Sequence, residues 1–147
     1  MTVATAEWLA NEPMQPTGPQ RSAPDGRRHK VDSLTGADPR VLRAGLLELL
    51  ELLGDAAAQE KYEQSVPIAD VPSELQCMWF DDAYLPQSPA FQAAFTATEL
   101  DALAEFDRFF RSRADALSFG GGVRELHRSK AWTEIMELAA AVRTRIT

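Results

Sequence analysis

A leucine-rich segment constrains the fold of this 147-residue chain most strongly. Leu42, Leu46, Leu49 and Leu53 recur at intervals of three and four residues, which is the spacing of one face of an α-helix. Three further leucines widen this apolar face past half of the helix circumference. A helix of this kind lies at the centre of a core, or it buries a second face against a partner.

Capping residues bound this helix. Asp38 is a good N-cap, and Pro39 is tolerated at the first helical position. Gly54 predicts the end of the helix, and Asp55 predicts the cap of the next one. A second, more polar helix is therefore expected over residues 56–64.

Two more helices follow from periodicity in the second half of the chain. Thr96 and Glu99 form a capping box that predicts a helix over 97–117. Its apolar arc comprises Leu100, Leu103, Phe106, Phe110, Ala114 and Leu117. A glycine triplet at 120–122 predicts a loop, and the last helix then runs to the end of the sequence. The apolar face of that helix comprises Trp132, Ile135, Ala139, Val142 and Ile146.

The segment between these regions is ambiguous. Pro67 and Pro72 interrupt the chain, and Ser73 with Gln76 fits a capping box for a short helix. The continuous apolar run C-M-W-F within 74–82 also fits a buried strand, and periodicity does not separate the two. Both alternatives stay open.

Residues 1–37 are predicted to be a disordered tail. They contain four prolines, carry no net charge and offer few apolar residues to offset the entropy cost of ordering. Their basic cluster at 27–30 is interpreted as solvated, with a contact to nucleic acid or to an acidic surface as the alternative. Residues 38–147 are predicted to form a single all-α domain, an irregular bundle of about four to six helices.

Charge is distributed unevenly along the chain, whose net charge is −7. Residues 48–107 hold thirteen acids against one cation, Lys61, whereas residues 108–147 hold eight cations against four acids. An acidic surface predicts a basic protein partner, because complementary fields steer association. The same charge argues against direct binding to nucleic acid and to anionic membranes.

Cysteine content and hydropathy suggest the compartment. Cys77 is the single cysteine, so no intrachain disulfide forms, which favours a reducing, cytoplasmic location. No apolar stretch approaches the roughly 18 residues that a membrane-spanning helix needs. The first residues lack the basic and apolar regions of a secretory signal.

Candidate catalytic groups are few. Asp81 and Asp82 are paired carboxylates, but adjacent residues on a helix diverge by about 100°, so they do not form a two-carboxylate site alone. Cys77 and His127 are the residue types of a nucleophile–base pair, yet Cys77 lies in an apolar run and is interpreted as a small buried hydrophobe. No cluster has zinc-ligand spacing. We therefore predict no catalytic residue, no metal site and no cofactor.

Two residues of the helix over 97–117 depart from its pattern. Asp107 falls inside the apolar arc and is interpreted as a rim residue paired with Arg111, with a buried contact to a cation of another helix as the alternative. Phe109 lies off the core face, so it either meets another segment or is exposed for a partner.

Several segments together resemble families of small acidic bacterial helical proteins of uncharacterised function. The segments are LLELLELLGD, then Gln59 and Tyr62, then W-F-D-D, then F-x-x-x-F-T-x-x-E-L-x-A-L-x-x-F, and finally K-A-W-T-E-I, over residues 40–146. Some members of such families are presumed to be toxin-immunity proteins. The resemblance implies a partner-binding role, with no cofactor and no catalytic residue.

The leading hypothesis is a non-enzymatic, acidic protein-binding module that neutralises or regulates a basic protein, as an immunity protein or inhibitor does. Nucleic-acid mimicry towards a nuclease is a variant of it. The carboxylates would supply charge complementarity and the tyrosine a rigid anchor. Alternatives are a small hydrolase using Asp81 or Asp82, and a homo-oligomer formed through the leucine-rich helix 42–53. The predicted partner-binding residues are Asp81, Asp82, Tyr84, Glu99, Asp101 and Glu105.

Overall fold

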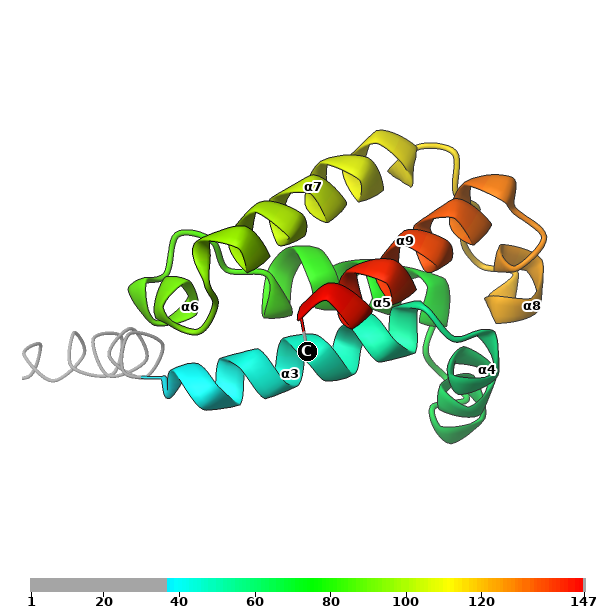
Figure 1. Cartoon of the computed structure of the whole chain (residues 1–147). Coiled ribbons are helices and arrows are strands. Elements are labelled where there is room, and N and C mark those ends of the chain that lie inside the picture. Colours follow the sequence, from blue (N-terminus) through cyan, green and yellow to red (C-terminus); the bar gives the residue numbers. More distant parts are fainter. Residues whose placement is uncertain (1–36, 147) are drawn as a thin grey trace, which may run out of the picture. The chain divides into compact units, whose positions relative to one another are not determined.

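The computed structural model describes residues 37–146 (Figure 1), which confirm the all-α class. No strand occurs in this part of the chain. The predicted disorder of residues 1–37 lies outside the described residues, apart from Ala37. Residues 37–146 form seven α-helices and one π-helical turn: α3 (Pro39–Leu53), α4 (Ala56–Ser65), α5 (Val71–Cys77), η3 (Met78–Ala83), α6 (Pro89–Ala93), α7 (Ala97–Ala114), α8 (Gly122–Leu126) and α9 (Lys130–Ile146).

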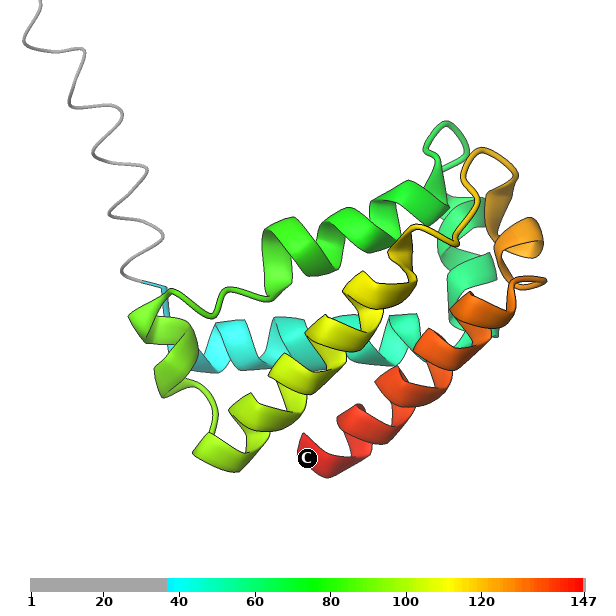
Figure 2. The same ribbon diagram turned by 90° about the horizontal axis from the view of Figure 1, so that it is seen from above.

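Three long helices form the frame of the domain. The last of them, α9, packs on both α3 and α7 (Figures 1 and 2). The continuous stretch of α5 and η3 and the helix α9 both lie above α3 in Figure 1, and seen from above they run to either side of it (Figure 2). The turn η3 packs on α3. The short helices close the ends, with α4 against α8 at one end and α6 against the start of α3 at the other (Figure 1).

Aromatic rings run through the core as a connected series. Neighbouring ring centroids lie 4.8 to 5.9 Å apart, within the range of stacked and edge-to-face contacts. The series joins α6, η3, α7 and α9, so one cluster holds together elements that are far apart in sequence. In order, its members are Phe91, Tyr84, Trp79, Phe106, Phe110 and Trp132. The predicted burial of Trp132 is confirmed.

Gln59 is the one buried polar residue of the described chain. Its Nε2 donates to the carbonyl oxygens of Leu52, at 3.0 Å, and Leu53, at 2.9 Å. Its Oε1 accepts from Trp132 Nε1, at 3.1 Å, and from His127 Nε2, at 2.8 Å. The amide therefore satisfies carbonyls that the end of α3 leaves without an intrahelical donor, and it links them to α8 and α9.

Most predicted caps are confirmed. The Asp38 carboxylate accepts from the Arg40 backbone N–H at 2.9 Å, and Asp55 caps α4. The capping box of Thr96 and Glu99 is present in both directions. Each of these caps depends only on residues within one helical turn, which explains why local sequence predicts them.

The predicted cap at Ser73 is wrong. The helix begins at Val71, with Asp70 at the N-cap position, and the Ser73 hydroxyl donates to the Asp70 carboxylate at 2.7 Å. Pro72 is part of the first helical turn instead of a break. Proline fits there because backbone N–H groups of the first turn have no intrahelical acceptor.

The ambiguous segment 74–82 is helical, so the strand alternative is wrong. At Met78 the α-helix widens into the π-helical turn, in which the Tyr84 N–H donates to the Trp79 carbonyl, five residues back, at 3.2 Å. The structure also contains two helices that were not expected, α6 and α8, of five residues each. Gly120, in the loop before α8, and Gly122, the first residue of α8, have φ angles of 87° and 78°, where a side chain would be strained.

Candidate partner-binding surface

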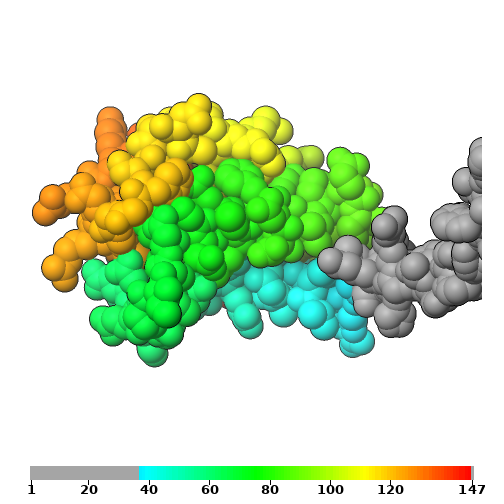
Figure 3. All heavy atoms as spheres, turned by 180° about the vertical axis from the view of Figure 1, so that it is seen from behind, coloured from blue at the N-terminus to red at the C-terminus, as the bar shows by residue number. Residues whose placement is uncertain are grey.

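Four of the predicted carboxylates are exposed. Asp81 and Asp82 lie in η3, and Asp101 and Glu105 lie one turn apart on α7. Within residues 37–146 none of the four forms an ion pair. Figure 3 shows the face on which α5 and η3, in green, meet the start of α3, in cyan.

The π-helical turn places Asp81 and Asp82 by fixing the tryptophan that precedes them. Trp79 is fully buried, and its Nε1 donates to Asp107 Oδ1 of α7 at 2.9 Å. This bond ties η3 to α7. Because successive residues of a helical turn point in different directions, the burial of Trp79 leaves the two following carboxylates at the surface.

Asp107 has the predicted partner and one that was not foreseen. Its Oδ2 accepts from Arg111 Nε at 2.9 Å, four residues along the helix, so the expected rim ion pair is confirmed. The contact from another element comes from the Trp79 indole and not from a cation. Phe109 is half-buried, and the Arg113 guanidinium of its own helix lies 4.0 Å from its ring centroid.

Tyr84 is partly buried and packs against the core. Its ring stacks on Trp79 with a centroid distance of 4.9 Å and an interplanar angle of 7°, and it meets Phe91 edge-on. Burial, and then the negative charge of Asp107, raises the pKa of the Tyr84 hydroxyl. Because the ring is held on two sides by the protein itself, it does not stand free as an anchor for a partner.

Glu99 is held in a two-bond ion pair with Arg43 of α3. The distances are 2.8 and 2.9 Å, and the Glu99 side chain is 14% exposed. Arg43 also donates to the carbonyl oxygens of Ala94 and Ile146. The hydrogen bonds from Arg43 and from the Thr96 backbone outweigh burial and lower the pKa of Glu99 to about 2. The carboxylate is therefore engaged within the domain.

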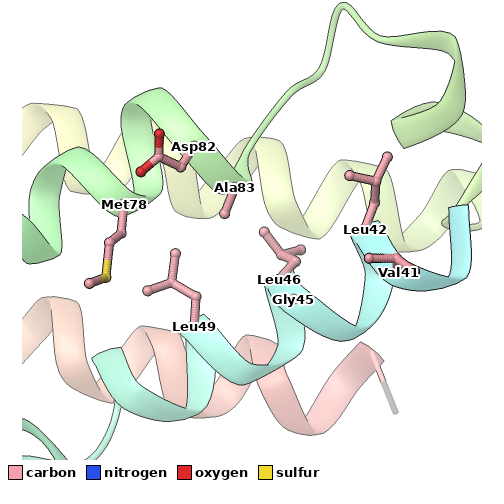
Figure 4. A pocket seen from close by; sticks show the side chains of 8 residues that line it. All are labelled: Val41, Leu42, Gly45, Leu46, Leu49, Met78, Asp82 and Ala83. Carbon is pink, nitrogen blue, oxygen red and sulfur yellow. The ribbon is translucent and has the colours of Figure 1, made fainter. Parts of the chain in front are cut away.

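An open apolar groove lies between α3 and η3 (Figure 4). Its volume is about 270 Å³, and Asp82 is its one charged lining residue. Figure 4 shows Leu46 and Leu49 of α3 facing Met78 of η3 across it. The other lining residues are Val41, Leu42, Gly45 and Ala83. The leucine pattern does not predict this groove, although Gly45 in the middle of the leucine-rich helix departs from that pattern.

Two further predictions concern alternative functions. A small hydrolase would need a second carboxylate or a histidine beside Asp82. The residues that line the groove include neither. The leucine-rich face of α3 is turned inward: Leu46, Leu49, Leu50 and Leu53 are buried, and the other leucines pack against the core. The surface expected to form a homo-oligomer is therefore largely covered by the chain itself.

The Cys77–His127 pair does not form. Cys77 is exposed near the end of α5, so its predicted burial is wrong: the same turns place Val71 and Leu75 inward and Cys77 outward. Loss of hydration, followed by the charge of Asp81, raises the pKa of the thiol, which disfavours the thiolate. His127 instead donates to Gln59. Within residues 37–146 no group of three or more His, Cys, Asp or Glu side chains is placed to hold a metal ion.

Comparison with protein-family models, with curated proteins and with solved structures finds no match to this chain. Among the described helices, none has both the length and the apolar character needed to cross a bilayer.

Proposed function

We propose that this protein is a non-enzymatic binding module for a basic protein partner. The supporting observation is the division of its carboxylates into two kinds. Asp107 and Glu99 are paired inside the domain, whereas the acids at 81, 82, 101 and 105 are exposed and form no ion pair in the described chain. Exposed carboxylates without an ion pair are accessible to lysines and arginines of a partner.

The acids contribute mainly to the rate of encounter. An uncompensated acidic surface attracts a basic protein over the screening length, about 8 Å at physiological salt. Rim charges of this kind alter the association rate more than the dissociation rate. An immunity protein that must capture a basic toxin before it acts benefits from fast association, and a nuclease inhibitor whose carboxylates imitate phosphates needs the same feature. Both are specific forms of the proposed role.

Reversing the charge of the proposed binding acids, and separately that of acids elsewhere on the surface, tests the proposal. A site triple replaces Asp81, Asp82 and Asp101 by lysine. A control triple replaces Glu60, Asp115 and Glu137, which are exposed acids of α4, the end of α7 and α9, also by lysine. Both triples change the net charge equally, so any difference between them reports position.

The partner is first captured from the source cell with the wild-type chain and is then purified. Surface plasmon resonance measures both rate constants at low and at physiological salt. The site triple is expected to slow association at least about tenfold, with a smaller change in dissociation, and the control triple less than about threefold. Equal effects of the two triples would refute a specific acidic surface.

A further inference from the structure

The groove between α3 and η3 contains a glycine that no contact within the described chain explains. Gly45 lies in the interior of α3, where glycine destabilises a helix relative to alanine. A Cβ added at this position would have no atom within 4 Å, so nothing packs against the glycine. By contrast, a Cβ at Gly54 would lie 3.1 Å from the backbone of Ala140, which accounts for that glycine. Open space above a helical glycine lets another backbone approach closely.

Acidic residues lie in the groove and beside it. Asp82 lines it from η3, and Asp81 is adjacent in sequence. On α3, Glu48 follows Gly45 by three residues, so it lies on the same face of the helix. Glu48 is exposed and has no ion pair within residues 37–146. An apolar groove with one carboxylate in its lining and another on the adjoining turn of α3 is complementary to a segment that carries apolar and cationic side chains together.

The size and surroundings of the groove restrict what it binds. Pockets for small molecules usually measure about 300–1,000 Å³ and hold several polar groups. This groove measures about 270 Å³ and has one polar side chain, so it suits one or two apolar side chains better. Because helices form both walls and the described residues present no strand edge, addition of a strand is not available. The lining holds no aromatic side chain, which the recognition of a polyproline segment uses. A helix lying in the groove is the common mode that fits an aliphatic lining between two helices.

We infer that the groove binds an amphipathic, basic helix of the protein partner. An apolar side chain of that helix enters between Leu46, Leu49 and Met78, its backbone crosses α3 at Gly45, and its cations meet Asp82 and Glu48. This inference rests on the proposed function, and it names the groove as the site where the partner binds. A second copy of the chain is a poor occupant, because it carries the same net charge of −7.

The test uses the full chain and a defined probe. The probe is a fluorescein-labelled, 18-residue peptide of leucine and lysine arranged as an amphipathic helix. A peptide of the same composition, scrambled to remove the apolar face, is its control. Fluorescence anisotropy is expected to give micromolar affinity for the amphipathic peptide and at least tenfold weaker binding of the scrambled one.

Two substitutions locate the site. Gly45→Trp fills the groove from an open position and is expected to weaken binding at least tenfold, and Asp82→Lys at least fivefold. Matched controls on the exposed face of α9, Ala141→Trp and Glu137→Lys, are expected to change affinity less than twofold. Circular dichroism melts check that each variant is folded.

The outcomes separate the inference from the proposed function. Equal binding of the two peptides, or unchanged binding by Gly45→Trp, overturns the groove while leaving an acidic binding surface intact. If neither peptide binds at low salt, both proposals fail. A wild-type dimer that Gly45→Trp converts to a monomer in sedimentation velocity would identify a second copy as the occupant and overturn the inference.

The chain's own basic cluster is checked in the same way. Arg27, Arg28 and Lys30 are replaced together by alanine in the full chain. A tenfold gain in peptide affinity would assign the groove to this segment and overturn the inference. Unchanged affinity supports an external partner.

Discussion

The ion pair between Arg43 and Glu99 should contribute more stability than any other in the described domain. Its two short bonds join α3 to the start of α7, and Arg43 extends the link to the Ile146 carbonyl at the end of α9. Replacing Glu99 by Gln removes the charge but keeps a side-chain oxygen that can accept from the Thr96 N–H. The substitution therefore isolates the electrostatic part of the interaction from the capping box.

The magnitude follows from the pKa of Glu99, which falls from 4.5 to about 2 on folding. At 1.36 kcal/mol per unit, this gap corresponds to about 3 kcal/mol. Arg43 is 32% exposed, and water screens part of the interaction, so we expect a loss of about 2 kcal/mol for Glu99→Gln. For a domain of this size the melting temperature should fall by about 8 °C.

The sign of the pH dependence is fixed by the lowered pKa. The stabilisation is fully present above pH 4.5 and is lost as pH falls towards about 2, because the carboxylate then becomes protonated in the folded state. The difference in unfolding free energy between wild type and Glu99→Gln should thus be constant from pH 7 to about 5 and nearly vanish by about pH 2.

Urea titrations followed by circular dichroism at several pH values measure this difference. Glu105→Gln is the control, because Glu105 is an exposed acid of the same helix with no ion pair in the described residues; its effect should stay within about 0.5 kcal/mol. A Glu99→Gln variant as stable as wild type at pH 7, or a loss that does not change with pH, would refute the reasoning.

Three other predictions concern stability and reactivity. Trp132→Ala should lower the unfolding free energy by about 3–5 kcal/mol, because the ring is fully buried and its Nε1 donates to Gln59; an unchanged urea midpoint would contradict this. Gly45→Ala should raise the unfolding free energy by about 0.5–1 kcal/mol in thermal melts, since the added methyl group meets open space. A lower unfolding free energy would mean that another group of the chain packs against Gly45. Cys77 should react with iodoacetamide at pH 8 more slowly in the native than in the unfolded chain, because its pKa is raised, and Asp81→Asn should speed the native reaction; equal native and unfolded rates would argue against that shift.

The parts of the fold that the sequence predicts are those encoded within a few residues. The helices α3, α7 and α9 repeat their apolar pattern over several turns, and their caps are local. In contrast, α6 and α8 span five residues each, too few to show a helical period. The run C-M-W-F is apolar on every side because Trp79 packs on α7 while Met78 lines the groove towards α3, so no period was visible.

In the candidate site, too, the features that local sequence encodes are predicted, and those that depend on long-range contacts are not. Local charge density predicts that acids such as Asp81 and Asp101 are exposed. It does not predict that Glu99 pairs with Arg43, because the two residues are 56 positions apart and meet only in the folded domain. Tyr84 is likewise enclosed by Phe91 and Trp79 through tertiary packing. Long-range pairing therefore decides which members of an acidic, aromatic segment remain available to a partner.

The central position of α9 has a consequence for synthesis of the chain. The Ile146 carbonyl bonds to Arg43, 103 residues earlier, and Trp132 completes the hydrogen bonds of Gln59. While the ribosome is still translating, α3 emerges long before α9, so the part of its leucine face that α9 buries stays uncovered. We expect the domain to fold only after residues 130–146 have left the ribosome, in one cooperative step, because contacts this distant in sequence delay folding. Chains interrupted before α9 should be captured by chaperones or degraded.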